Sequence, residues 1–227
     1  MSSEQIEISN NLNKVKQTLP EKVCLVAVSK TKPSELIHQA YQAGQRDFGE
    51  NKIQEMCEKY DELPKDIRWH MIGHIQRNKV KYMAPFVHLI HGVDSLRLLE
   101  EINKRALQNN RIIPCLLQIH IAEETTKFGF SFQEISSFFT EEQYKNYPNV
   151  QIKGFMGMGT NGVSESQTRM EFAKLKKCFD KTNHTYPIDT LSIGMSNDYT
   201  LAIQEGSNMV RIGSAIFGKR NYPTVNQ

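Results

Sequence analysis

Hydrophobic positions along the chain follow one repeated pattern, in which a short apolar run is followed by a longer amphipathic stretch. The runs are near-continuous in hydrophobicity, which is typical of strands buried on both faces of a parallel sheet. Regular alternation of strand and helix indicates an α/β protein. The pattern predicts eight strands, at residues 23–28, 45–49, 67–73, 88–93, 115–122, 152–159, 190–195 and 209–213.

The stretches between the runs predict helices, and several carry signals for where a helix begins or ends. Pro33 suits a first helical position, and Gly44 suits the end of the same helix. Either Ser196 or Asn197 could cap a helix that ends at Gly206. A leading N-terminal helix is also expected before the first strand, with an apolar face made of Ile8, Leu12, Val15 and Leu19.

Eight strand–helix units in about 200 residues predict a closed (β/α)₈ TIM barrel near the lower end of its usual size. An open, doubly wound sheet is the structural alternative. That fold usually has a G-x-G-x-x-G turn after its first strand, where this chain has SKTKP. No composition shift or flexible linker divides the sequence, so residues 1–227 are expected to form one domain.

Composition places the chain among globular proteins, with 39% hydrophobic and 23% charged residues. No apolar run approaches the roughly 20 residues that span a bilayer, and the N-terminus does not resemble a signal peptide. The basic residues are scattered and give a net charge of only +3, which does not predict nucleic-acid binding. We therefore expect a cytoplasmic protein without membrane or nucleic-acid partners.

Cysteine spacing supports the same compartment. Cys24, Cys57, Cys115 and Cys178 are far apart in the sequence and form no C-x-x-C pair. Two of them lie in apolar strand-like runs, where small thiols are commonly buried. The sequence therefore predicts reduced, unpaired thiols.

The most unusual polar residue is Lys30, directly after the first strand in VCLVAVSKTKP. In barrels of this type, active sites lie at the carboxyl ends of the strands. A lysine amine held partly out of water loses its proton more readily and can then attack an aldehyde. The alternative is a surface lysine that merely ends a strand. Lys32, just before Pro33, is expected to be solvated.

Other strand ends carry polar residues whose roles the sequence leaves open. Asn51 in FGEN either hydrogen-bonds a ligand or caps the next helix. In WHMIGHIQRNK, His70 is expected to point into the packing and His74 to lie in the loop, without a metal-binding arrangement. Lys127 either faces the pocket or is solvated in its own loop.

The last two strands predict an anion site. SIGMSNDYT and VRIGSAIFG each run from a strand through Gly or Ser into a helix start, where Ser196, Gly213 and Ser214 would converge on a phosphate. Arg211 lies within the eighth strand, and burying it is unfavourable unless it is paired. Its partner is either a ring nitrogen or a structural carboxylate. A phosphate site, a nucleophilic amine and an arginine for a pyridine ring together fit pyridoxal 5′-phosphate (PLP).

At this point the sequence resembles a known family. VAVSKTKP, FGENKIQE, WHMIGHIQRNK, LSIGMSNDYTLAI and VRIGSAIFG are similar to the signature blocks of the pyridoxal phosphate homeostasis proteins, also called the proline synthetase co-transcribed family. The blocks occur in the family's order and span most of the chain. The chain has Ile75 where the family often has Leu, and GFM where the family often has GLM.

The resemblance implies a barrel like the N-terminal domain of alanine racemase, the fold type III of PLP proteins. It implies a covalent Schiff base between Lys30 and PLP. By the same mapping, Arg211 approaches the pyridine nitrogen and Asn51 lies near the ring. The phosphate would be held by Ser196, Gly213 and Ser214.

Two considerations favour a carrier over an enzyme. Alanine racemases need a second, β-rich domain that supplies a tyrosine acid/base, and this chain ends soon after its last predicted strand. An arginine at the pyridine nitrogen keeps its own proton and leaves the ring a weaker electron sink. We therefore expect a monomeric PLP carrier or regulator of vitamin B6 and amino-acid pools, with PLP-dependent apo-enzymes as candidate partners.

Two other functions stay open at this point. One is a weak PLP-dependent amino-acid racemase or decarboxylase. Turnover of an amino acid that disappears in the Lys30→Ala variant would favour this function. The other is a Schiff-base aldolase that acts on a sugar phosphate without PLP, which a yellow purified protein would exclude.

Overall fold

Eight parallel strands close into one barrel in the computed structural model, which describes residues 3–122 and 128–218. Each strand pairs with the next along the chain, and β8 pairs back with β1. The prediction of a closed (β/α)₈ barrel is confirmed, and the open-sheet alternative is wrong. The strands are β1 Cys24–Val28, β2 Asp47–Glu50, β3 Arg68–Met71, β4 Leu89–Val93, β5 Ile113–Ile119, β6 Val150–Gly157, β7 Thr190–Met195 and β8 Met209–Ile212.

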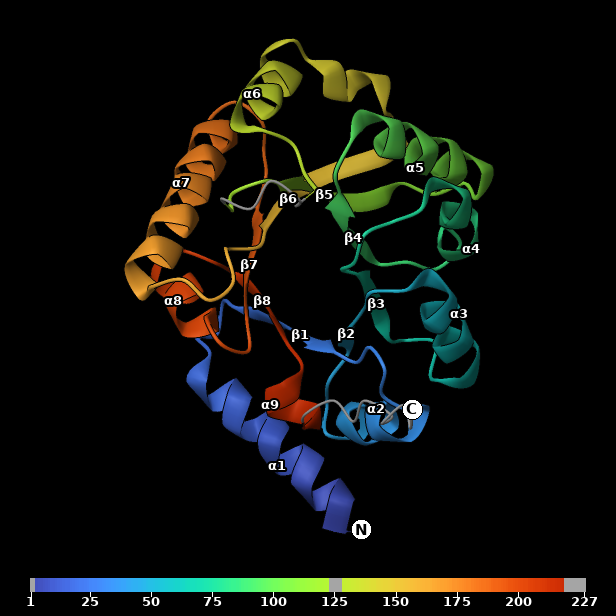
Figure 1. Ribbon diagram of the computed structural model, residues 1–227. Coiled ribbons are helices and arrows are strands. Elements are labelled where there is room, and N and C mark those ends of the chain that lie inside the picture. The colour runs from blue at the N-terminus through green and yellow to red at the C-terminus, as the bar shows by residue number, and fades with distance from the viewer. Residues whose placement is uncertain (1–2, 123–127, 219–227) are drawn as a thin grey trace, which may run out of the picture.

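The helices form a ring around the barrel, as Figure 1 shows. They are α1 Ser3–Thr18, α2 Ser34–Gln42, α3 Ile53–Glu62, α4 Val80–Met83, α5 Leu96–Gln108, α6 Phe132–Thr140, α7 Glu165–Asn183, α8 Tyr199–Gln204 and α9 Ser214–Phe217. Short 3₁₀ turns lie at Arg77–Lys79 and Gln143–Asn146. In the part of the chain that the structure describes, no helix is both long and apolar enough to cross a membrane.

Helix α1 is the predicted leading helix, and it lies outside the barrel alongside α9 (Figure 1). Its apolar face is buried at Ile8, Leu12 and Val15. The Asn11 Nδ2 donates a hydrogen bond to the Ile216 carbonyl oxygen at 3.3 Å. The first helix therefore supports the last one, which begins at the cavity described below.

Helix boundaries differ in detail from the sequence signals. Pro33 is the residue before α2 rather than its first residue, while Gly44 has φ +87 and follows the end of that helix as predicted. Neither residue predicted to cap α8 does so. Asp198 precedes that helix, and its carboxylate instead accepts a hydrogen bond from the Met195 N–H at 2.6 Å.

Two apolar clusters stabilise the fold. The larger fills the space between the sheet and the surrounding helices. The smaller lies on the inner face of the strands and consists of Val26, Leu89, Leu116, Met156 and Met209. Buried polar side chains share the barrel interior with this second cluster. They lie on β3, β4, β7 and β8 and are His70, His91, Ser192 and Arg211, respectively. All four cysteines are free thiols, as predicted.

Candidate functional site

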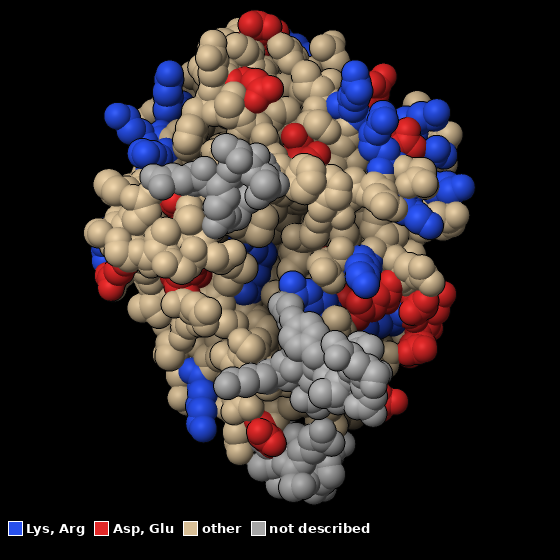
Figure 2. Space-filling model, viewed as in Figure 1, with Lys and Arg blue, Asp and Glu red and all other residues tan. Residues whose placement is uncertain are grey.

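A cavity of about 600 Å³ opens at the carboxyl ends of the strands. Figure 2 shows a hollow near the centre of this face with basic side chains inside it. Parallel topology brings together residues that are far apart in the sequence, because every strand ends at the same rim. All six residues predicted to bind the cofactor line this cavity: Lys30, Asn51, Ser196, Arg211, Gly213 and Ser214.

The loop that carries Lys30 is fixed on both sides of the lysine. Before it, the Ser29 N–H donates to the Gly49 carbonyl oxygen at 3.0 Å. After it, the Thr31 N–H donates to Glu55 Oε1 at 2.5 Å, and Thr31 has φ +64. A threonine in this left-handed region is strained by roughly 1–2 kcal/mol, and such strain is common at functional sites. The half-buried Lys30 is thus held at one position on the rim.

A buried ion pair lies beneath this loop. Lys59 Nζ donates to the Ser29 carbonyl oxygen and to Glu50 Oε1, both at 2.8 Å, and to Glu55 Oε1 at 2.7 Å. The Ser29 hydroxyl donates to the same Glu50 oxygen at 2.6 Å. Burial raises the pKa of the Glu50 carboxyl to about 7, although the Lys59 charge and these hydrogen bonds act in the opposite direction. The Lys30 loop therefore rests on a carboxyl that titrates near neutral pH.

We expect a Glu50→Gln variant to show what this carboxyl does to stability. A carboxyl whose pKa rises from 4.5 to about 7 on folding takes up a proton between those values. Wild-type stability relative to the variant should therefore fall as pH rises from about 4.5 to about 7, by roughly 3 kcal/mol. Urea unfolding at several pH values measures this difference.

The matched control for that experiment is Glu58→Gln, which changes an exposed carboxyl on α3, the helix that carries Lys59. Its stability should follow the wild-type protein across the pH range. Parallel curves for wild type and Glu50→Gln would contradict the shifted pKa.

Asn51 offers an unsatisfied acceptor to the cavity. Its Oδ1 is buried and has no hydrogen-bond partner among residues 3–122 and 128–218. An unpaired buried oxygen costs about 1–3 kcal/mol, so a ligand donor placed there would be favourable. The alternative role as a helix cap is wrong, because Lys52 is the residue that precedes α3.

The loops after β7 and β8 meet at the opposite side of the cavity. The Gly213 N–H donates to the Ser196 Oγ at 3.3 Å, which joins the two loops. Ser214 is exposed at the start of α9. A side chain on Gly213 would lie 3.0 Å from the Val28 carbonyl oxygen, so a glycine lets this loop lie against β1. Helices α8 and α9 have only six and four residues, so their dipoles attract an anion less strongly than longer helices would.

Arg211 lies at the floor of the cavity and is 4% exposed. Its Nη1 donates to the Ser192 carbonyl oxygen at 2.8 Å and to the Ser192 Oγ at 2.6 Å, and its Nη2 donates to the Gly157 carbonyl oxygen at 3.0 Å. No carboxylate of residues 3–122 or 128–218 forms an ion pair with it, so the structural-carboxylate alternative is wrong there. Burial lowers the pKa of Arg211 to about 10, with Asp198 opposing. The guanidinium remains charged at neutral pH and can donate to a ring nitrogen.

Several cavity residues were not identified from the sequence. Lys32 was expected to be solvated, but it lines the cavity, and its Nζ donates to the Phe217 carbonyl oxygen at 2.8 Å. His74 lines the cavity as well, stacks on Phe128 at 4.2 Å and bonds Asp94 at 2.9 Å. Gln118 also lines the cavity, and its place as a polar residue within an apolar run could have identified it from the sequence. Lys127 lies outside the described residues.

The amino ends of the strands hold an arrangement that the sequence did not reveal. His70 is buried as expected, but Asp47 and His88 lie beside it, and one ligand atom of each lies within 4.8 Å of the others. Arg68 already binds both oxygens of Asp47, at 2.7 and 2.5 Å. A metal ion would have to compete with this guanidinium.

Comparison with known proteins gives a consistent result. The sequence matches the family model of the alanine racemase N-terminal domain over residues 5–221. It is 38% identical over 201 residues to the pyridoxal phosphate homeostasis protein of Aquifex aeolicus, with 87% of each chain covered.

Two solved structures have a similar fold. PipY of Synechococcus elongatus, solved with PLP bound, is 33% identical with a TM-score of 0.85, covering 93% of this chain and all of PipY. An alanine racemase of Clostridium difficile is 16% identical with a TM-score of 0.78, covering 96% of this chain and 58% of the racemase. The likeness to the racemase concerns the fold alone.

Proposed function

Because the chain belongs to the alanine racemase N-terminal domain family, and within it to the pyridoxal phosphate homeostasis proteins, we propose that it binds PLP in the cavity at the carboxyl ends of the strands. One observation carries the proposal: an amine, a buried arginine that pairs with no carboxylate of the described residues, and two joined Ser/Gly loops line one cavity of about 600 Å³. Cavities of roughly 300–1,000 Å³ suit small-molecule ligands.

The proposed roles follow from the chemistry of each side chain. Lys30 would hold the cofactor covalently, because its amine can condense with an aldehyde with loss of one water molecule. Arg211 donates a hydrogen bond to the pyridine nitrogen, and the free Asn51 oxygen accepts from a hydroxyl on the ring. Ser196, Gly213 and Ser214 hold the phosphate.

We further propose that the protein carries or regulates PLP, and does not turn over amino acids at a substantial rate. When bound, PLP supplies an electron-withdrawing ring for chemistry on amines. Arg211 remains protonated and donates to the ring nitrogen, which reduces that withdrawal. The proposal is also supported by the names of the relatives, which describe homeostasis of this cofactor.

The proposed setting is the cytoplasm, in agreement with four free thiols. There the protein would act as a monomer and exchange PLP with PLP-dependent apo-enzymes. Mixing the loaded protein with such an apo-enzyme, and following the recovery of its activity, tests this exchange.

Absorbance spectroscopy tests the binding proposal. Titration with PLP should produce a visible band that borohydride abolishes, and peptide mass analysis should then locate one pyridoxyl phosphate group on Lys30. Absence of any band, or an adduct only on another lysine, would contradict the proposal. A panel of amino acids tested with sensitive turnover assays distinguishes a carrier from a racemase or decarboxylase.

A further inference from the structure

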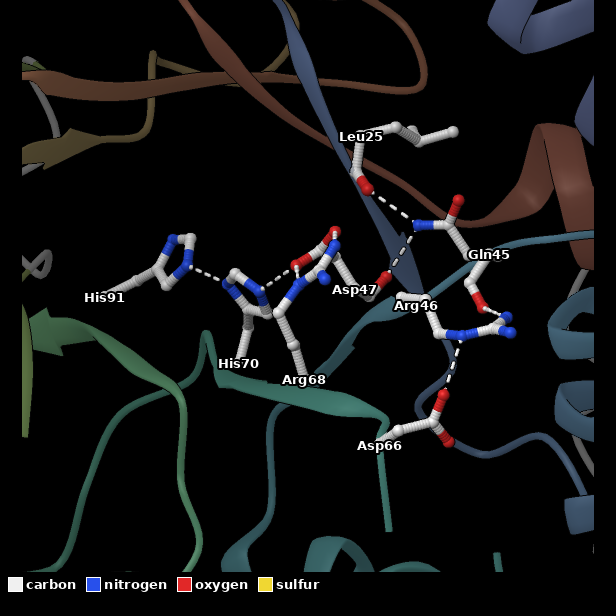
Figure 3. Close-up of polar contacts among 8 residues, drawn as sticks. All are labelled: Leu25, Gln45, Arg46, Asp47, Asp66, Arg68, His70 and His91. Atoms are coloured by element: carbon white, nitrogen blue, oxygen red, sulfur yellow. Dashed lines mark hydrogen bonds and ion pairs between the residues drawn. The ribbon is translucent and has the colours of Figure 1, made fainter. Parts of the chain in front are cut away.

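A continuous run of buried polar side chains crosses the barrel interior beneath the cavity. We call it the interior network and define it as Arg211, Ser192, His91, His70 and Asp47. Its members come from β8, β7, β4, β3 and β2 in that order, so it connects opposite sides of the barrel. Figure 3 shows the part that runs from His91 through His70 to Asp47 and Arg68. No role proposed above uses the members other than Arg211.

Each neighbouring pair in the interior network is within hydrogen-bonding distance. Arg211 Nη1 lies 2.6 Å from the Ser192 Oγ, which lies 3.1 Å from His91 Nδ1. His91 Nε2 lies 3.0 Å from His70 Nδ1, and His70 Nε2 lies 3.0 Å from Asp47 Oδ1. Ser192 and His91 are fully buried, and His70 is 1% exposed. Water therefore does not replace these bonds.

The two ends of the interior network fix the direction of its hydrogen bonds. Arg211 can only donate, because a guanidinium has no acceptor. Asp47 can only accept: burial opposes its charge, but hydrogen bonds from Arg68 and His70 prevail and hold its pKa well below the usual range. Burial lowers the pKa of His91 well below its usual value, so this ring carries one proton.

One assignment of protons satisfies every contact between these ends. His70 donates from Nε2 to Asp47 and accepts at Nδ1, so His91 must donate from Nε2 and accept at Nδ1. The Ser192 hydroxyl then donates to His91, which leaves its lone pairs directed at Arg211. A second proton on His70 would add a positive charge beside Arg68, with only Asp47 to balance both.

This order compensates for the lack of a carboxylate paired with Arg211 in the part of the chain that the structure describes. Aligned hydrogen bonds polarise one another in a low-dielectric interior, so the negative end at Asp47 is felt along the network. The engaged Ser192 hydroxyl cannot rotate to present its hydrogen to Arg211. The guanidinium is therefore held in one orientation at the cavity floor.

We propose that the interior network positions Arg211 for the cofactor ring, with both histidines protonated on Nε2 and every bond donated toward Asp47. The role toward the ring rests on the proposed PLP function, whereas the proton assignment does not. Ser192, His91, His70 and Asp47 are positioning residues, because they act on the ring only through Arg211.

Nuclear magnetic resonance of the cofactor-free, ¹⁵N-labelled protein tests the proton assignment. Two-bond proton–nitrogen correlations should show Nε2–H tautomers for both His70 and His91 in metal-free buffer. A proton on Nδ1 of either ring, or an unprotonated His70 Nε2, would overturn the proposal. This measurement needs neither a variant nor PLP, so it stays decisive even if PLP binding fails.

Ser192→Ala tests the effect on the ring. We expect PLP affinity to fall about tenfold and the absorbance maximum of bound PLP to shift, because Arg211 loses its directed acceptor. Ser192→Thr, which restores a hydroxyl, should recover the wild-type absorbance maximum. Unchanged affinity and spectrum in Ser192→Ala would overturn the positioning role.

Ser207→Ala is the matched control. Ser207 is also a buried serine near the same strands, but within the described residues its hydroxyl bonds only backbone carbonyl oxygens, those of Leu191, Ile193 and Met209. Its loss should lower the free energy of unfolding without moving the absorbance maximum. If the wild-type protein itself binds no PLP, the proposed function fails and the tautomer result still decides the proton assignment.

Discussion

A Lys30→Ala variant is expected to lose the visible absorbance band of bound PLP completely. Removal of the amine removes the only atom of the rim loop proposed to bond the aldehyde carbon. Affinity should fall at least about 100-fold, with only noncovalent contacts to the ring and phosphate remaining. Absorbance titration and mass analysis after borohydride reduction measure both effects.

Lys32→Ala is the control for this experiment. This second lysine lines the same cavity, but its Nζ is engaged by the Phe217 carbonyl oxygen. The variant should keep a borohydride-stable adduct on Lys30. An adduct that survives Lys30→Ala and disappears in Lys32→Ala would show that the two roles had been exchanged.

A Ser214→Asp variant is expected to bind PLP on the order of 100-fold more weakly, because a negatively charged carboxylate beside the phosphate would repel it. Ser214 is exposed at the first position of α9, where an acidic residue suits a helix, so stability should hardly change. Titration of affinity and urea unfolding of the same variant separate the two quantities.

Two comparisons make the phosphate assignment specific. Ser214→Ala removes one hydroxyl without adding charge and should weaken PLP binding only a few-fold. Pyridoxal, which lacks the phosphate, should bind Ser214→Asp and the wild-type protein equally well. Equal losses for pyridoxal and PLP would place the phosphate elsewhere.

The barrel and the rim residues were accessible from the sequence because they obey local rules. Buried strands appear as short apolar runs, and a polar residue directly after such a run must lie at the rim. Lys30 and Ser214 were found in this way. Arg211 was found because a charge inside an apolar run requires a partner. The resemblance to a family added their proposed roles.

The interior network could not be found by the same rules. His91 on β4 meets Ser192 on β7 only because the sheet closes, so the contact joins positions 101 residues apart. His70 was expected to point into the packing, and it is buried, but the sequence did not reveal that it bonds Asp47 and His91. Lys32 was misassigned for a similar reason, because its acceptor at Phe217 lies 185 residues further along the chain.

The pairing of β8 with β1 has a consequence for the order of events in the cell. Lys30 leaves the ribosome well before Arg211, Gly213 and Ser214, which follow it by about 180 residues in the chain. In a nascent chain the Lys30 amine is therefore present long before the residues proposed to bind the phosphate have been synthesised. The B6 vitamer is therefore expected to bind only after β8 has been synthesised and has paired with β1. A bound vitamer then indicates that the barrel has closed.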